Sequence, residues 1–158
     1  MTGRKGEECV KEINIVKTEI CHIDDITTIE KLSFTIPWTK NAFVQELKNN
    51  KFAIYLSAKI ENKVVGYAGM WKIFDEGHIT NIAVHPEFRQ IGIGSKLLEG
   101  LINISKKVNI TKMTLEVRRS NKSAQTLYMK YGFKAAGIRK EYYADNGEDA
   151  VIMWNKSL

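Results

Sequence analysis

Apolar residues recur along this chain with two different periodicities, which predict where strands and helices lie. Short apolar runs bounded by turn residues predict strands, and apolar residues three and four positions apart predict amphipathic helices. The predicted strands cover residues 13–16, 52–58, 64–73, 78–84, 113–117, 133–138 and 150–154. The predicted helices begin near residues 24, 39, 92 and 121. This order predicts an α/β (α+β) domain with a mixed, mostly antiparallel central sheet flanked by helices.

Polar residues ahead of the first two helical patterns are typical helix N-caps. Asp24 or Asp25 is expected to cap the first helix, with Leu32 on its buried face beside two isoleucines. Thr39 is expected to cap the second helix, which follows Pro37. A proline cannot continue a preceding helix, so two separate helices are predicted here.

The length of 158 residues and the hydrophobic fraction of 44% suit one compact domain with one core. We expect this domain to span residues 12–158. Residues 1–11 are polar and without periodicity, which predicts a mobile tail. No apolar run approaches the roughly 18 residues that a membrane helix needs. The N-terminus also lacks the apolar stretch of a secretory signal, so a cytoplasmic protein is predicted.

Charge and cysteine content narrow the chemistry. The net charge is +6, and the basic residues are spread along the chain instead of forming one arm or helix. A polyphosphate ligand explains this excess at least as well as a nucleic acid, and no direct nucleic-acid role is predicted. Cys9 and Cys21 have no metal-ligand spacing, and His22, His78 and His85 form no cluster. We therefore expect reduced thiols and no metal site.

The segment from residue 81 to 98 is the most informative part of the sequence. An apolar strand ends there, and a loop containing Gly92 and Gly94 opens a helix. Backbone N–H groups at a helix start are unpaired and carry the positive end of the helix dipole, which favours phosphate. The dinucleotide fingerprint needs a third glycine, and the phosphate loop of nucleotide hydrolases needs Gly-Lys-Ser/Thr, where this chain has Gly94-Ser95-Lys96. The segment therefore matches neither of these two nucleotide-binding motifs.

Two further residues are candidates for proton transfer. Glu116 lies in a strand whose apolar residues alternate, which places it on the face opposite to the buried one. A solvated strand carboxylate is the ordinary interpretation of that position. Tyr128 belongs to a helical stripe with Ala124, Leu127 and Tyr131, which predicts a core residue. Its ring can pack while its hydroxyl reaches a cleft.

The pattern R-x-x-G-x-G, formed by Arg89, Gly92 and Gly94 after residues 81–84, resembles the acetyl-CoA-binding motif of the GNAT superfamily of N-acetyltransferases. Segments on both sides resemble its RimI-type branch, the ribosomal-protein-alanine N-acetyltransferases. These segments are Phe34, residues 37–39, 115–118, 120–121, 127–128, 131–133, 142–143 and 147–150. The resemblance runs from about residue 13 to the C-terminus and implies the GNAT acyl-CoA N-acyltransferase fold.

This resemblance implies roles for individual residues. The cofactor-binding residues would be Ile82, Ala83, Val84, Arg89, Gln90, Ile91, Gly92, Ile93, Gly94, Ser95 and Asn121. Glu116 matches the family's proton acceptor, and Tyr128 matches its general acid. Trp38, Tyr142 and Tyr143 would border a groove for a peptide N-terminus, although Trp38 is equally expected to be an anchor between two helices. Ile91 departs from the polar residue that is common at its position.

The implied reaction is direct attack of an amine on acetyl-CoA, with the N-terminal alanine of small-subunit ribosomal protein eighteen as acceptor. Another protein N-terminus, a lysine or a small polyamine is an alternative acceptor. A non-catalytic acyl-CoA-binding or nucleic-acid-binding module is the alternative of another class, but it would need neither Glu116 nor Tyr128. The pair Arg118-Arg119 could bias the acceptor or touch the cofactor's phosphates, and the sequence leaves both open.

Overall fold

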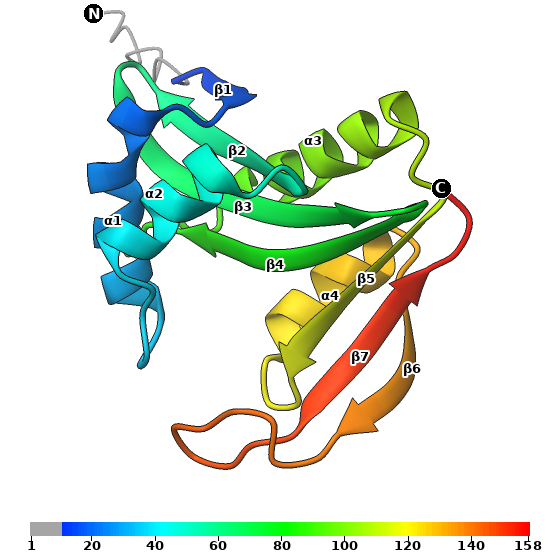
Figure 1. The fold of residues 1–158 in the computed structure, drawn as a ribbon. Helices are drawn as coiled ribbons and strands as arrows, with labels where there is room; N and C mark the ends of the chain where they lie inside the picture. Colours follow the sequence, from blue (N-terminus) through cyan, green and yellow to red (C-terminus); the bar gives the residue numbers. More distant parts are fainter. Residues whose placement is uncertain (1–10) are drawn as a thin grey trace, which may run out of the picture.

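A computed structural model describes residues 11–158 and arranges them around one seven-stranded sheet (Figure 1). The strand order is β1-β2-β3-β4-β5-β7-β6. Every neighbouring pair is antiparallel except β4 and β5, which are parallel. This confirms the predicted mixed, mostly antiparallel sheet. The predicted mobile tail, residues 1–11, lies outside the described residues except for Lys11.

All the predicted strands and helices are present, with small shifts at their ends. The strands are β1 (Ile13–Lys17), β2 (Ala53–Ile60), β3 (Lys63–Ile73), β4 (Glu76–Val84), β5 (Lys112–Arg118), β6 (Lys134–Arg139) and β7 (Ala150–Asn155). The α-helices are α1 (Ile23–Ser33), α2 (Lys40–Asn49), α3 (Ile93–Lys107) and α4 (Lys122–Lys130). Short 3-10 helices cover Ile20–His22 and Pro86–Phe88.

The start and the buried face of α1 differ from the sequence-based expectation. A 3-10 turn runs directly into the helix, so the N-cap is His22, and Asp24 and Asp25 lie in the first turn. There they still face the positive end of the helix dipole. Leu32 is 53% exposed, so its predicted burial is wrong. It lies about two and a half turns beyond the buried Ile23, which puts it on the opposite side of the helix.

The helices form one layer on each face of the sheet. On one face, α1 and α2 bury Ile26, Ile29 and Phe43 against Tyr67 of β3. On the other face, leucines of α3 and Tyr128 of α4 pack against the sheet in a second cluster. The predicted cap of α2 is confirmed, because the Thr39 side chain accepts a hydrogen bond from the Ala42 amide at 3.1 Å.

The parallel pair β4–β5 opens toward one end, and this opening positions the site. The two strands are paired only where Glu76–His78 faces Lys112–Thr114. Beyond that point they diverge, as Figure 1 shows. The rest of β4, residues 79–84, keeps its partner β3 but loses β5. Its main-chain groups on the β5 side are therefore available to a ligand that lies in the opening.

Candidate functional site

The loop between β4 and α3 has an unusual main-chain path. After the 3-10 turn Pro86–Phe88, Gln90 has φ +64° and Gly92 has φ +89°. Both values lie in the left-handed region, which a residue without a side chain adopts readily. Gly92 is the N-cap of α3, and it has no side chain that could cap the helix. The loop therefore turns sharply and delivers the chain to a helix start with an uncapped amide cluster.

The amides from Gln90 to Ser95 have no partner among residues 11–158. The next residue, Lys96, is the first to donate, and its amide bonds the Gly92 carbonyl at 3.1 Å. The unpaired amides at the start of α3 carry the positive end of the helix dipole. The loop can therefore accept an anion without breaking any hydrogen bond of the protein.

The glycine that caps α3, Gly92, and the glycine in the first turn of that helix, Gly94, have little protein packed against them. A Cβ atom on Gly92 would meet no heavy atom within 4 Å. A Cβ atom on Gly94 would lie 3.6 Å from Leu127, which is an ordinary contact. The protein itself therefore does not require a small residue at position 94. A small residue there leaves the main chain open to a ligand that approaches it.

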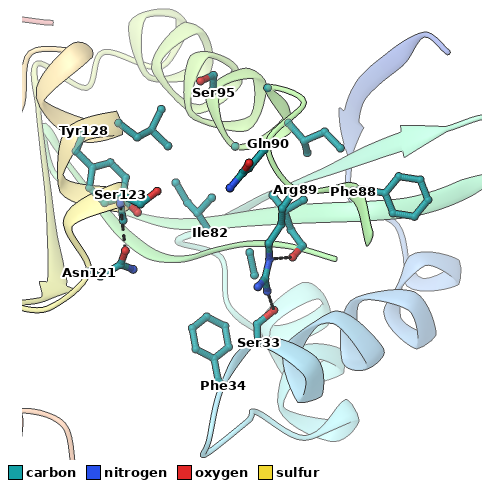
Figure 2. A pocket seen from close by; sticks show the side chains of 17 residues that line it. Ser33, Phe34, Ile82, Phe88, Arg89, Gln90, Ser95, Asn121, Ser123 and Tyr128 are labelled. Atoms are coloured by element: carbon teal, nitrogen blue, oxygen red, sulfur yellow. Dashed lines mark hydrogen bonds between the residues drawn. The ribbon is translucent and has the colours of Figure 1, made fainter. Parts of the chain in front are cut away.

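A cavity of about 560 Å³ lies over this loop (Figure 2). It contains every predicted cofactor residue except Ile91, whose side chain points outward and is 55% exposed. Its wall on the α4 side includes Asn121 and Tyr128, and Ile82 of β4 lines it as well. Residues 82–84, the loop and the start of α4 thus surround one space.

Two of the predicted cofactor residues also have structural roles. The Arg89 guanidinium donates from Nε to the Val84 carbonyl at 3.0 Å and from Nη2 to Ser33 Oγ at 3.3 Å (Figure 2). It therefore ties the end of β4 to α1. The Asn121 side chain accepts from the Ala124 amide at 3.1 Å and caps α4. Both residues line the cavity while they fix its walls.

A second cavity, of about 720 Å³, adjoins the first. The two share residues of α1 and the loop after it, of β4, and of α4 with its N-cap: Ser33, Phe34, Ile82, Asn121, Ala124 and Tyr128. The second cavity also contains Glu116, Trp38, Tyr142 and Tyr143. All the predicted catalytic and acceptor-binding residues are therefore brought to one space, which is continuous with the first cavity.

Glu116 lies on the face of β5 that the alternation predicts. Met113, Leu115 and Val117 are buried, while 29% of the Glu116 side chain is exposed. Its Oε1 accepts a hydrogen bond from Nε of Arg139, on β6, at 3.1 Å. The carboxylate is therefore held in place through one oxygen, and its second oxygen makes no hydrogen bond to the described residues.

Tyr128 is both a core residue and a wall of the two cavities. It is 9% exposed, and its ring lies 5.9 Å from that of Phe133. Burial raises the pKa of Tyr128 to about 12, with a smaller contribution from Tyr143. Its hydroxyl has no hydrogen-bond partner within residues 11–158. At neutral pH the Tyr128 hydroxyl is therefore protonated, and it donates its proton to none of the described residues.

The aromatic residues of the second cavity come from two separate connections. Trp38, between α1 and α2, packs on Phe43 with ring centroids 5.5 Å apart, so it is an anchor as well as a cavity wall. Tyr142 and Tyr143, between β6 and β7, form an edge-to-face pair at 5.1 Å. Tyr142 is 49% exposed at the rim. The cavity is thus bordered by aromatic rings on two sides.

Sequence reasoning missed Glu30, a buried carboxylate of α1 that lines the second cavity. It is 2% exposed, and its pKa is raised by burial, which outweighs the hydrogen bonds from Tyr67 and Trp38. The Tyr67 hydroxyl donates to Oε2, and the Trp38 amide donates to Oε1 at 3.0 Å. A signal existed: Glu30 follows Ile26 by four residues and so interrupts the apolar stripe of α1.

One group of possible metal ligands occurs within residues 11–158, away from the residues that line the two cavities. Glu19, Cys21 and His22 place one ligand atom each within 4.8 Å of the others. The His22 Nδ1 already accepts from the Glu19 amide at 3.1 Å and lies 3.1 Å from Ser57 Oγ. That nitrogen is therefore engaged inside the protein, and the predicted lack of a metal stays a prediction.

Comparisons with known proteins agree on one family. Residues 23–133 match the acetyltransferase (GNAT) family. A Bacillus subtilis protein, provisionally named a ribosomal protein bS18-alanine N-acetyltransferase, is 46% identical over 84% of this chain and 87% of its own length. The Escherichia coli ribosomal protein bS18-alanine N-acetyltransferase is 36% identical over 79% of this chain and 84% of its own length.

Solved structures give the same result. The crystal structure of the ribosomal-protein-S18-alanine N-acetyltransferase from Escherichia coli has a TM-score of 0.84 and 31% identity, and the match covers 93% of this chain and 96% of that one. Within residues 11–158, none of the helices has the length and apolar character needed to cross a membrane. The sequence match, the shared fold and the loop at the start of α3 together establish that this chain belongs to the acetyltransferase (GNAT) family.

Proposed function

We propose that this protein transfers an acetyl group from acetyl-CoA to the N-terminal alanine of small-subunit ribosomal protein bS18. The carrying observation is that the two cavities meet at Ile82 and Tyr128. One holds unpaired main-chain amides that suit a diphosphate, and the other holds a carboxylate that suits an amine. The names of the Bacillus and Escherichia relatives support bS18 as the acceptor.

The residues around the first cavity fit acetyl-CoA. This donor supplies an acetyl group activated as a thioester. The amides from Gln90 to Ser95 and the start of α3 bind its diphosphate. The unpaired side of β4, residues 79–84, hydrogen-bonds the extended pantetheine arm in place of β5. An N–H group near Val84 then faces the thioester carbonyl and stabilises negative charge as the amine attacks.

Glu116 acts as the proton acceptor of the reaction, and Tyr128 acts as its proton donor. An amine is protonated at neutral pH and must lose a proton before it can attack. Glu116 accepts this proton, with Arg139 holding one carboxylate oxygen and leaving the other for the amine. Tyr128 donates its proton to the departing sulfur of coenzyme A. The pKa of about 12 ensures that Tyr128 is protonated before this step. The nitrogen loses a second proton as the amide forms, and this proton restores the Tyr128 hydroxyl. The proton taken up by Glu116 leaves to solvent, so the transfer releases one proton in all.

The acceptor enters between the two aromatic connections. Trp38 borders the entry on the α1–α2 side, and Tyr142 and Tyr143 border it on the β6–β7 side. An N-terminal peptide can pass between them with its first residue toward Glu116. We further propose that the protein works in the cytoplasm, where ribosomal proteins are made.

A second acceptor class has one observation in its favour. A Sulfurisphaera tokodaii protein named N-alpha-acetyltransferase is 34% identical over 90% of this chain. Its name specifies no single acceptor protein. Acetylation of several unrelated N-termini is therefore the alternative that the acceptor assay must separate from bS18.

The test is mass spectrometry of acceptors incubated with the protein and acetyl-CoA. The acceptors are a bS18 peptide with its N-terminal alanine, the same peptide with a blocked N-terminus and an internal lysine, an unrelated N-terminal peptide, and spermidine. We expect one acetyl group on the α-amine of the bS18 peptide and none on the blocked peptide. Comparable acetylation of the unrelated peptide would favour the broader alternative. Acetylation of lysine or spermidine alone would contradict the proposal.

A further inference from the structure

The β6–β7 connection, residues 140–149, carries two aromatic walls of the acceptor cavity without any helix or strand of its own. Inside it, the Tyr143 amide donates to the Glu148 carbonyl at 3.1 Å, and the Gly147 amide donates to the Tyr143 carbonyl at 2.8 Å. These bonds shape the connection but do not attach it to the rest of the sheet. The end of the connection is joined to the chain after β5, because the Arg119 amide donates to the Asp149 carbonyl at 3.1 Å. The placement of Tyr142 and Tyr143 against the cavity needs side-chain contacts from another element.

Arg118, the last residue of β5, supplies these contacts. Its Nη2 lies 2.8 Å from Asp145 Oδ2, and its Nη1 lies 3.2 Å from Asn146 Oδ1 and 3.4 Å from Glu148 Oε1. The guanidinium carbon also lies 4.0 Å from the centre of the Tyr143 ring. A planar guanidinium can make several charged hydrogen bonds and stack on a ring at the same time, which a lysine cannot do.

The cluster formed by Arg118 with Tyr143, Asp145, Asn146 and Glu148 also contacts the chain that enters α4, the helix of Tyr128. The Oε2 of Glu148 accepts from the Ser120 amide at 2.7 Å, directly before the N-cap Asn121. Glu148 therefore bonds Arg118 through one oxygen and the chain entering α4 through the other. The acceptor wall and the helix that borders both cavities are thus joined through one carboxylate.

The cluster also approaches the opposite wall of the acceptor cavity. The pKa of Asp145 is lowered first by the hydrogen bond from Arg118 and also, to a smaller extent, by the hydroxyl of Thr35 in the α1–α2 connection. The pKa of Glu148 is lowered mainly by Ser120. Both carboxylates are therefore stabilised in their charged form, which is the form that binds Arg118.

We propose that Arg118 is a positioning residue for the acceptor: it fixes the β6–β7 connection, and with it Tyr143, against the acceptor cavity. Arg118 acts through Tyr143 and Asp145 and transfers no proton. The inference rests on the proposed function, since it assigns the acceptor to this cavity. It also decides between the two roles that the sequence left open, because Arg118 lines the acceptor cavity and not the cavity over the loop.

The neighbouring residue provides a matched control. Arg119 carries the same charge one position later, but its side chain is 62% exposed and lines neither cavity. Its one ion pair within residues 11–158, to Asp149 at 3.5 Å, joins it to the end of the connection. A nonspecific effect of removing one positive charge would appear equally in variants of both arginines. An effect of positioning would appear only in those of Arg118.

The experiment compares Arg118→Gln, Arg118→Lys and Arg119→Gln with the wild type in two measurements. Steady-state kinetics uses acetyl-CoA and the bS18 N-terminal peptide, and hydrogen exchange follows the Tyr143 and Gly147 amides without substrate. For Arg118→Gln we expect a peptide KM about tenfold higher, with kcat and acetyl-CoA affinity within about twofold. Both amides should exchange faster. Arg118→Lys should recover part of the loss, and Arg119→Gln should match the wild type.

Unchanged exchange together with an unchanged peptide KM in Arg118→Gln would overturn the inference, as would a fall in kcat at constant KM. Should that variant not fold, Asp145→Asn removes the same ion pair from the connection and must give the same pattern. A wild type that acetylates no bS18 peptide would refute the proposed function instead. The exchange measurement needs no acceptor, so it still decides whether Arg118 fixes the connection.

Discussion

The two cavities that meet at Tyr128 are built from different kinds of chemical group. The first is formed largely by one continuous stretch, from Ile82 to Ser95, and its polar surface combines the unpaired main-chain N–H groups of the loop with polar side chains such as Arg89 and Asn121. The second is assembled from side chains of α1, β4, β5, α4 and the β6–β7 connection. Its polar groups are fixed by pairs such as Glu116 with Arg139 and Glu30 with Tyr67.

This difference has a functional consequence. A surface made of main-chain amides suits a donor that is always the same, because side chains can vary without altering the N–H groups. A surface made of side chains can be changed one residue at a time to suit a different acceptor. Substitutions in the first cavity should therefore alter donor affinity, and substitutions in the second should alter turnover or acceptor binding.

The largest effect is expected at Glu116. Replacing it with glutamine removes the proposed proton acceptor but keeps the shape of the side chain. We expect kcat to fall by about a hundredfold, the lower part of the range for general base catalysis. Affinity for acetyl-CoA, measured by calorimetry, should not change. The surface variant Glu61→Gln is the control, and a Glu116→Gln enzyme with wild-type turnover would exclude Glu116 as the base.

A smaller effect is expected in the first cavity, at Gly94. Alanine fits there without a clash in the protein and is a better helix former by about 1 kcal/mol. Gly94→Ala should therefore keep or raise the melting temperature, while acetyl-CoA binding weakens by about tenfold because the methyl group occupies the ligand's approach. Gly92 is a poorer test, since its φ of +89° strains any side chain. Unchanged affinity in a stable Gly94→Ala protein would contradict the proposed binding mode.

The smallest effect concerns Glu30 and pH. The pKa of Glu30 in the folded protein is raised by burial above its ordinary value of 4.5. Folding therefore favours the protonated form, and the associated stability is present below the unfolded-state pKa and lost as pH rises through the folded-state pKa. Relative to Glu30→Gln, the free energy of unfolding of the wild type should decline over this interval. The lowered pKa values of Asp145 and Glu148 change the stability with pH in the opposite direction. They contribute equally to the wild type and to Glu30→Gln, so they cancel in the difference between the two proteins.

Chemical denaturation of the wild type and Glu30→Gln across this pH interval measures the effect. Two curves that stay parallel would show that Glu30 keeps an ordinary pKa in the folded protein. The acceptor KM of Glu30→Gln should also rise, since the Trp38 amide loses a charged partner.

The same contrast explains what the sequence could predict. The order of strands and helices follows from local periodicity, and the amide-rich loop lies within a few consecutive residues, so both could be predicted. The ion pairs of Arg118 join residues 27 and 30 positions apart, and only the fold brings them together. The cap of α1 was missed because the 3-10 turn Ile20–His22 has no sequence signal of its own.

The central claim is that the amides from Gln90 to Ser95 bind the diphosphate of coenzyme A. Amide resonances of the protein, followed by nuclear magnetic resonance while coenzyme A is added, test it directly. We expect the largest shifts at these six amides. The same titration with pantetheine, which carries no phosphate, should leave them nearly unchanged. Shifts confined to other parts of the molecule, or binding of coenzyme A without any change at this loop, would contradict the claim.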